Sequence, residues 1–334
     1  MEEVKQIVSN IRQGIFHPIY FLYGDEPYFI DKVASYIGEN VLSEEERGFN
    51  QMILYGKDTS LDEVISNAKR YPMMAEKQVV IVREAQHLSR TIEQLAAYAE
   101  QPQESTLLVF CYKYKKLDKR KKLYKTLLSN NGFLFESKKL YENQVSDWIR
   151  GLLKGKGYTI THKASMLLVE FLGTDLSRIN NELEKLMLVL DEGSEISPEA
   201  IEHHIGISKD FNNFELKKAI GERDILKAAR IVTYFAQNPR ENPFVVTLSL
   251  LHNFFSQLLQ YHGLHDHNPK TVASALRINP YFVNEYQTAA RNYSMRRSTE
   301  IVTALRELDL KGKGVGASQM SHPDLLKEML AKIV

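Results

Sequence analysis

Two apolar runs decide the fold: QVVIV at residues 78–82 and TLLVFCY at residues 106–112. Continuous apolar runs of this length are typical of strands that are buried on both faces of a parallel sheet. Three further apolar or β-rich runs, at residues 19–23, 49–55 and 132–136, bring the predicted strands to five. Helix signals separate these runs, and a chain that alternates strands with helices predicts an α/β domain with a parallel sheet.

The sequence after residue 140 carries helical patterns only. Apolar stripes at residues 145–153 and 176–190 have helical spacing, and Ser197 with Pro198 opens another helix. The polar, turn-rich stretch GISKDFNN at residues 206–213 predicts a linker. We therefore predict three domains, an α/β domain at residues 1–140, a small helical domain at 141–208 and a larger all-helical domain at 209–334. The Phe/Leu-rich stretch 244–259 is a candidate for the core or an interface of the last domain.

The composition is that of a globular protein. Of the 334 residues, 43% are hydrophobic and 25% are charged, which excludes disorder as the main state. The formal charge of +1 provides no overall attraction to nucleic acid or to a membrane. A lone cysteine, Cys111, excludes an internal disulfide and lies inside a predicted strand, where a thiol is inert packing. The N-terminal segment lacks the apolar core of a signal peptide, so we expect a cytoplasmic protein.

A phosphate-binding loop would follow the first strand, and its residues are missing there. Such a loop needs two glycines, a lysine and a hydroxyl, whereas this sequence offers Gly24 alone and places Asp25 and Glu26 after it. The acidic pair expected at the end of another strand is replaced by Arg83 and Glu84. We expect Asp25 and Glu26 to cap the helix that begins at residue 27, and these five positions to bind no nucleotide.

Six stretches in these and later segments resemble one family. They are PIYFLYGDEPYFI (18–30), RGFN (47–50), PMMAEKQVVIVREAQHL (72–88), KKLDKRKKLYK (115–125), GTDLSRINNELEKL (173–186) and DLKGKG (309–314). In this order they resemble the delta subunits of bacterial DNA polymerase III, which are AAA+ clamp-loader proteins that have lost ATP binding. The resemblance implies a RecA-like α/β domain with a parallel sheet, a three-helix lid and an all-α collar domain.

The resemblance also implies a role and partners. Family members bind and open the ring-shaped sliding clamp (beta) so that it can be loaded on primed DNA. They do so beside the ATPase subunits (gamma/tau) and the delta-prime subunit, with no membrane involved. No intrinsic catalysis, cofactor or metal is expected, and the DNA-directed DNA polymerase label of the family belongs to the whole assembly. Two other functions remain alternatives, an active nucleoside triphosphatase acting on nucleic acid and a basic nucleic-acid-binding adaptor.

The clamp contact implied by the resemblance is a short apolar pair before the strand at residues 78–82. It falls on Met73 and Met74, with Pro72 breaking the helix that begins at Ser60. Methionine is unbranched and adapts to irregular apolar pockets, although family members often carry Leu-Phe here. The alternative is that both methionines plug the edge of the sheet.

A dense basic segment spans residues 113–125, where eight basic residues face one acid, Asp118. Its candidate contacts with DNA or with a partner are seven: Lys115, Lys116, Lys119, Arg120, Lys121, Lys122 and Lys125. Neutralising phosphates would add salt-dependent affinity for DNA, whereas a solvated basic face touching acidic neighbours is the alternative. We expect Asp118 to cap a helix whose Leu128 faces the core.

Four other groups of residues have local explanations. Arg178 is expected to pair with Glu182 one helical turn later. The cluster of His262, His265, Asp266 and His267 is expected to mark a helix end and not a metal site. His203 and His204 are expected to be a surface pair on one helix. Gly312, Gly314 and Gly316 are expected to form a connection between helices.

Overall fold

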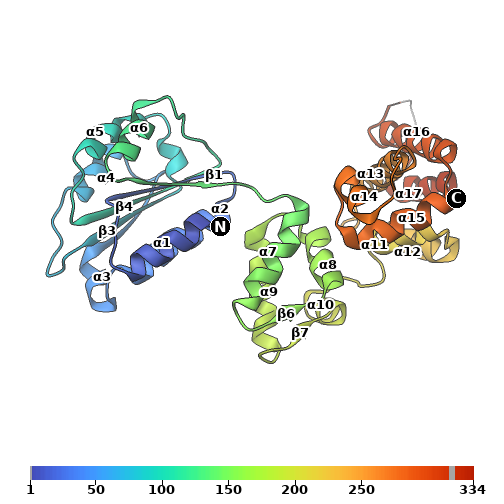
Figure 1. Ribbon diagram of the computed structural model, residues 1–334, viewed down its shortest axis with the longest axis horizontal. Coiled ribbons are helices and arrows are strands. Elements are labelled where there is room, and N and C mark those ends of the chain that lie inside the picture. Colours follow the sequence, from blue (N-terminus) through green and yellow to red (C-terminus); the bar gives the residue numbers. More distant parts are fainter. Residues whose placement is uncertain (1, 316–319) are drawn as a thin grey trace. The chain divides into compact units, whose positions relative to one another are not determined.

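The computed structural model describes residues 2–315 and 320–334. The chain divides into two compact units, Met1–Leu140 and Tyr141–Val334 (Figure 1). None of the helices in the described ranges combines the length and the apolar character that a membrane span requires.

The first unit is built on a parallel sheet of five strands, as predicted. The order of the strands in this sheet is β2-β3-β4-β1-β5. Its strands are β1 (Ile19–Gly24), β2 (Gln51–Tyr55), β3 (Gln78–Arg83), β4 (Thr106–Lys113) and β5 (Phe133–Ser137). Its helices are α1 (Glu2–Arg12), α2 (Pro27–Asn40), α3 (Glu44–Asn50), α4 (Leu61–Ala68), η1 (Ala85–Leu88), η2 (Ile92–Gln94), α5 (Leu95–Glu100) and α6 (Lys122–Ser129). Gly24 pairs with Lys113 on one side and with Ser137 on the other, so these three strand ends lie together.

Both faces of this sheet are covered, which explains the continuous apolar runs. Figure 1 shows α1 on one side of the sheet and α4, α5 and α6 on the other. Alternate residues of β4 serve the two cores: Val109 packs with the α1 and α2 side chains, and Phe110 packs with those of α4, α5 and α6. Cys111 is fully buried, and burial raises the pKa of its thiol to about 12, as expected for inert packing.

One predicted strand begins two residues later than expected. The run at residues 49–55 opens in helix α3, and β2 starts only at Gln51. A capping box explains the difference: the Ser43 hydroxyl accepts from Glu46 N–H (3.3 Å), and the Glu46 carboxylate accepts from Ser43 N–H (2.9 Å). This capping box stabilises α3, which includes the first two residues of the run predicted as a strand.

The second unit is helical apart from one short strand pair. Its elements are α7 (Glu142–Lys154), β6 (Thr159–Ile160), α8 (His162–Leu172), α9 (Leu176–Val189), β7 (Glu195–Ile196) and α10 (Pro198–Ile205), then α11 (Asn213–Glu222), α12 (Ile225–Gln237), α13 (Phe244–His262), α14 (Pro269–Leu276), η3 (Pro280–Phe282), α15 (Val283–Asn292), α16 (Met295–Gly312) and α17 (His322–Ile333). The expectation of helices alone was wrong for β6 and β7, which pair in parallel. Two-residue strands are too short to leave a period in the sequence.

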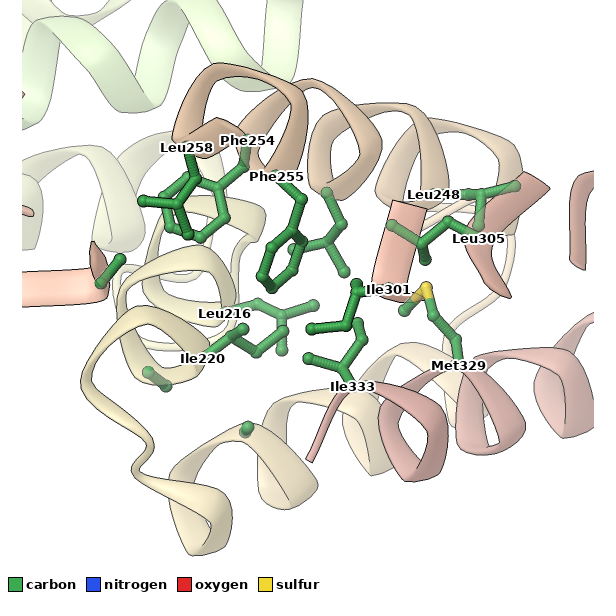
Figure 2. Packing of buried hydrophobic residues seen from close by; sticks show 14 of the residues in the cluster. Leu216, Ile220, Leu248, Phe254, Phe255, Leu258, Ile301, Leu305, Met329 and Ile333 are labelled. Carbon is green, nitrogen blue, oxygen red and sulfur yellow. The ribbon is translucent and has the colours of Figure 1, made fainter. Parts of the chain in front are cut away.

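The helices from α11 onwards share one core. Figure 2 shows Leu248, Phe254, Phe255 and Leu258 of α13 among side chains of α11, α16 and α17. The Phe/Leu-rich stretch at residues 244–259 therefore supplies core, while Val245 and Val246 remain exposed.

Candidate functional site

The carboxyl end of the central strands is where a sheet of this kind would hold a nucleotide. Gly24 ends β1 with φ of +130°, and a Cβ added there would lie 2.1 Å from the Ser137 carbonyl oxygen. The Glu26 N–H donates to the same carbonyl (3.2 Å), and the Ser137 hydroxyl donates to the Glu26 carbonyl (2.7 Å). The turn after β1 is therefore fixed against β5, and only glycine fits at position 24.

The first turn of α2 carries its own anion. Glu26 is 4% exposed, and its Oε1 accepts a hydrogen bond from Tyr28 N–H (3.0 Å). Backbone N–H groups at a helix N-terminus bind phosphate in nucleotide sites, and here this carboxylate accepts from one of them, that of Tyr28. The predicted cap is confirmed for Glu26 and wrong for Asp25, whose half-exposed carboxylate lies 3.6 Å from the Lys116 ammonium.

A buried lysine fills the neighbouring position. The Lys113 side chain is 11% exposed, and its ammonium lies 2.9 Å from an Asp31 carboxylate oxygen and 2.6 Å from one of Glu84. The Gln86 amide completes the cluster by donating to Glu84 (2.5 Å) and accepting from Lys113 N–H (3.3 Å). The basic segment therefore begins with a lysine that faces inward.

The charges of this cluster stabilise one another. Burial by itself would raise the pKa of the Glu84 carboxyl, but hydrogen bonds from Lys113 and Gln86 hold it below its ordinary value. Burial would lower the pKa of Lys113, but its hydrogen bonds to Glu84 and Asp31 raise it. Arg83, the last residue of β3, is half-buried beside them. Sequence reasoning missed the cluster, since Asp31 and Glu84 lie far from Lys113 along the chain.

The segment proposed to contact the clamp is a loop between α4 and β3. Helix α4 ends at Ala68, and Pro72 follows four residues later. Met73 is 63% exposed and Met74 is fully exposed at 105%. Met74 also has φ of +53°, in the left-handed region that side chains other than glycine rarely adopt. The alternative that both methionines plug the sheet edge is wrong, because their side chains point into solvent.

Asn50, which sequence reasoning missed, lies beneath this loop. It is 5% exposed at the end of α3. Its Oδ1 accepts from Met73 N–H (2.6 Å), and its Nδ2 donates to the Met73 carbonyl (2.9 Å) and to the Glu46 carbonyl (3.2 Å). The RGFN stretch contains this residue, but no local pattern indicates its partner 23 positions later.

Further apolar side chains of the first unit are exposed. Phe49, the residue before Asn50, is exposed, and Tyr71 is exposed two residues before Met73. Ile53 and Tyr55 on the edge strand β2 are also exposed. Phe49 and Tyr71 thus add exposed apolar groups next to Asn50 and Met73, which hydrogen bonds join. Exposed apolar surface of this kind is typical of a site that contacts another protein.

The remaining basic segment is exposed and partly paired with nearby groups. Its contacts are Lys115 with Ser89 (2.7 Å), Lys116 with Asp25 (3.6 Å), Arg120 with Asp118 (2.9 Å), Lys121 with Glu93 (3.6 Å) and Lys122 with Glu100 (2.7 Å). Within the described residues, Lys119 and Lys125 have no ion-pair partner. Exposed ion pairs contribute about 0–1 kcal/mol, so phosphates or another protein could replace the partners.

Two local expectations for this segment were wrong. Asp118 does not cap α6, which begins at Lys122; its carboxylate accepts instead from the backbone and guanidinium of Arg120, which lower its pKa to about 2. Leu128 does not face the core but is exposed, near the end of that helix.

The other groups of residues lie in the second unit. Arg178 does not pair with Glu182, whose carboxylate accepts from Lys185 instead (2.8 Å). The prediction of a helix end at the histidine cluster is confirmed, since α13 ends at His262, whose Nε2 lies 2.8 Å from the Tyr293 carbonyl oxygen. His203 and His204 both lie in the last turn of α10. Helix α16 ends at Gly312; Gly316 falls outside the described residues.

Comparison with known proteins gives concordant results along the chain. The model of the DNA polymerase III delta subunit matches residues 20–137, and the model of its C-terminal domain matches residues 210–330. The DNA polymerase III subunit delta of Bacillus subtilis (strain 168) is 28% identical over 321 residues, covering 93% of this chain and 92% of that protein.

A solved structure extends the similarity to the fold. The Bacillus subtilis DNA clamp loader delta protein matches with a TM-score of 0.53 and 27% identity, over 99% of both chains. This match confirms the expected architecture of a RecA-like domain followed by helical domains. The two family models together span more than two thirds of the sequence, and the chain therefore belongs to the DNA polymerase III delta subunit family.

Proposed function

We propose that this chain is the clamp-loader subunit that binds the sliding clamp through Met73 and Met74 and opens it for loading on primed DNA. The observation that carries the proposal is the exposure of these two side chains, 63% for Met73 and complete for Met74, on a loop that follows a helix end. An exposed apolar pair has no partner within its own unit, and burial in an apolar pocket of another protein would stabilise it. The expectation that Pro72 ends this helix was wrong, since α4 already ends at Ala68, and the pair lies in the loop beyond it.

Clamp binding can be tested directly with purified proteins. Burying a methionine side chain contributes about 1.5–3 kcal/mol, so Met73→Ala/Met74→Ala should weaken clamp binding by roughly two to three orders of magnitude. Met295→Ala is the matched control, since Met295 is also an exposed methionine, at 50%, but lies in the second unit. Affinity would be measured by calorimetry with the clamp of the same organism. Equal binding by wild type and the double variant would reject this site.

We further propose that the chain itself binds no nucleotide and catalyses no reaction. The Glu26 carboxylate at the start of α2 and the Lys113 cluster occupy the region where phosphates and a metal ion would lie. These contacts argue against the alternative of an active nucleoside triphosphatase. ATP hydrolysis is then the task of the gamma/tau subunits, beside delta-prime, in a cytoplasmic assembly that carries the polymerase label. Micromolar binding of Mg²⁺–ATP by the isolated chain in equilibrium dialysis would reject this proposal.

DNA contact by the basic segment is a separate proposal. Its support is the pair of ammonium groups at Lys119 and Lys125, which have no ion-pair partner in the part of the chain that the structure describes and are flanked by exposed cations that hold weak partners. Reversing the charge of both residues to Glu should reduce clamp loading on primed DNA by the reconstituted complex, with a larger effect at low salt. Unchanged loading would reject the contact. Strong DNA binding by the chain alone would favour the adaptor function instead.

A further inference from the structure

The loop at residues 71–77, called the methionine loop below, has few backbone hydrogen bonds. Gln78 anchors its beginning, because its Nε2 donates to the Arg70 carbonyl (2.5 Å) and to the Thr106 hydroxyl (2.7 Å). From residue 71 to residue 77, the backbone hydrogen bonds that the structure describes are those between Met73 and Asn50. One side chain therefore holds the middle of the loop.

The two hydrogen bonds from Asn50 define the position of Met73. The amide meets both the N–H and the carbonyl of a single residue, as a neighbouring strand would. Rotating the amide by 180° would set donor against donor and acceptor against acceptor, so only one orientation satisfies both groups. A third bond, to the Glu46 carbonyl, fixes the amide to α3. The loop is thus attached to the rigid part of the unit at Met73.

Burial of its own side chain does not stabilise the backbone conformation of Met74. Its side chain is fully exposed, while its backbone has φ of +53°, a conformation that is unfavourable for methionine. Such conformations persist where the surroundings impose them, and they are common where a binding group is preorganised. The residue next to Met74 is Met73, and its backbone is held by the hydrogen bonds to Asn50.

We infer that Asn50 is a positioning residue for clamp binding: by holding the Met73 backbone it presents Met73 and Met74 in the conformation that the clamp receives. The inference rests on the proposed function. Without the amide, the loop samples other conformations, and the apparent affinity falls with the fraction of time spent in the competent one. A loop that is competent for about a tenth of the time binds about tenfold more weakly.

Two variants of Asn50 test the inference. Asn50→Leu keeps the branched shape and makes neither hydrogen bond, and Asn50→Asp keeps the shape and the acceptor but sets an oxygen against the Met73 carbonyl. Asn130→Leu is the matched control, because the Asn130 amide also ties a loop of the same unit, by donating to the Ala99 carbonyl (2.9 Å). We expect about tenfold weaker clamp binding for both Asn50 variants and a change below twofold for the control. Circular dichroism would confirm that each variant is folded.

A second measurement separates positioning from a general loss of stability. In a Met74→Ala background, Asn50→Leu should weaken clamp binding much less than it does in the wild type, since a side chain needed for the benefit is gone. Equal losses in the two backgrounds, or wild-type affinity in folded Asn50 variants, would overturn the inference alone. Absence of clamp binding by the wild type would overturn the proposed function, and this inference with it.

Discussion

Replacing Lys113 by methionine would test the ion-pair cluster that lies where related folds hold a nucleotide. The change keeps most of the aliphatic side chain and removes the ammonium between Asp31 and Glu84. Removing one member of a fully buried ion pair costs about 3–5 kcal/mol. The Lys113 side chain is 11% exposed, but those of Asp31 and Glu84 are 47% and 34% exposed and can regain water. We therefore expect Lys113→Met to lower the free energy of unfolding by about 2–3 kcal/mol.

The sequence offers a convenient assay and a matched control. Trp148, the single tryptophan, lies in the second unit, so its fluorescence reports that unit while circular dichroism reports both. Urea unfolding of Lys113→Met should move the circular dichroism transition of the first unit and leave the Trp148 transition in place. Lys119→Met removes an exposed lysine of the same segment that has no ion-pair partner among the described residues, and it should change stability by less than about 0.5 kcal/mol. Equal effects of the two substitutions would refute the reasoning.

The same cluster predicts a pH dependence. The pKa of Glu84 is lower in the folded protein than its value near 4.5 in the unfolded chain. Its contribution to the free energy of unfolding is therefore complete above pH 4.5 and is lost as the pH falls through the folded-state pKa. The pKa of Lys113 is higher in the folded protein than its value near 10.5 in the unfolded chain. Its contribution to the free energy of unfolding is therefore complete below pH 10.5 and is lost as the pH rises through the folded-state pKa. The difference between wild type and Lys113→Met should therefore be constant between about pH 5 and pH 10 and shrink outside that window.

Three further predictions concern single residues. Met74→Gly should stabilise the first unit by about 1 kcal/mol in urea unfolding, because glycine accepts the positive φ, while it weakens clamp binding. Cys111 should react with a thiol reagent only after unfolding, since burial raises its pKa to about 12; fast reaction of the native protein would contradict its placement. Glu170 is largely desolvated, which raises its pKa to about 7 despite a hydrogen bond from the Asn213 N–H (2.5 Å). The free energy of unfolding of the second unit should therefore fall by about 2–3 kcal/mol between pH 4.5 and pH 8. Unfolding followed by Trp148 fluorescence should show this fall in the wild type and not in Glu170→Gln.

Much of the fold is readable from local patterns. The runs at residues 78–82 and 106–112 are apolar on both faces because helices cover both faces of the sheet. Helix α4 begins directly after Ser60, close to where the sequence predicts its start, and the Ser60 hydroxyl caps it by accepting from Glu63 N–H (3.2 Å). Both features depend only on residues that are close together in the sequence, so a local pattern is enough to predict them. The predicted start of β2 was two residues too early, because Phe49 suits a strand until the capping box at Ser43 is considered.

The candidate site divides in the same way. The sequence by itself determined that a phosphate-binding loop is missing after β1, and through resemblance it pointed to Met73 and Met74. Only the tertiary structure decided that both side chains are exposed, that Asn50 holds Met73 and that Lys113 turns inward to Asp31 and Glu84. Periodicity and capping act within a few residues, whereas these contacts join α3 to a distant loop and β4 to α2. They exist because the order of the parallel strands brings the ends of separate segments together, and no local pattern records that order.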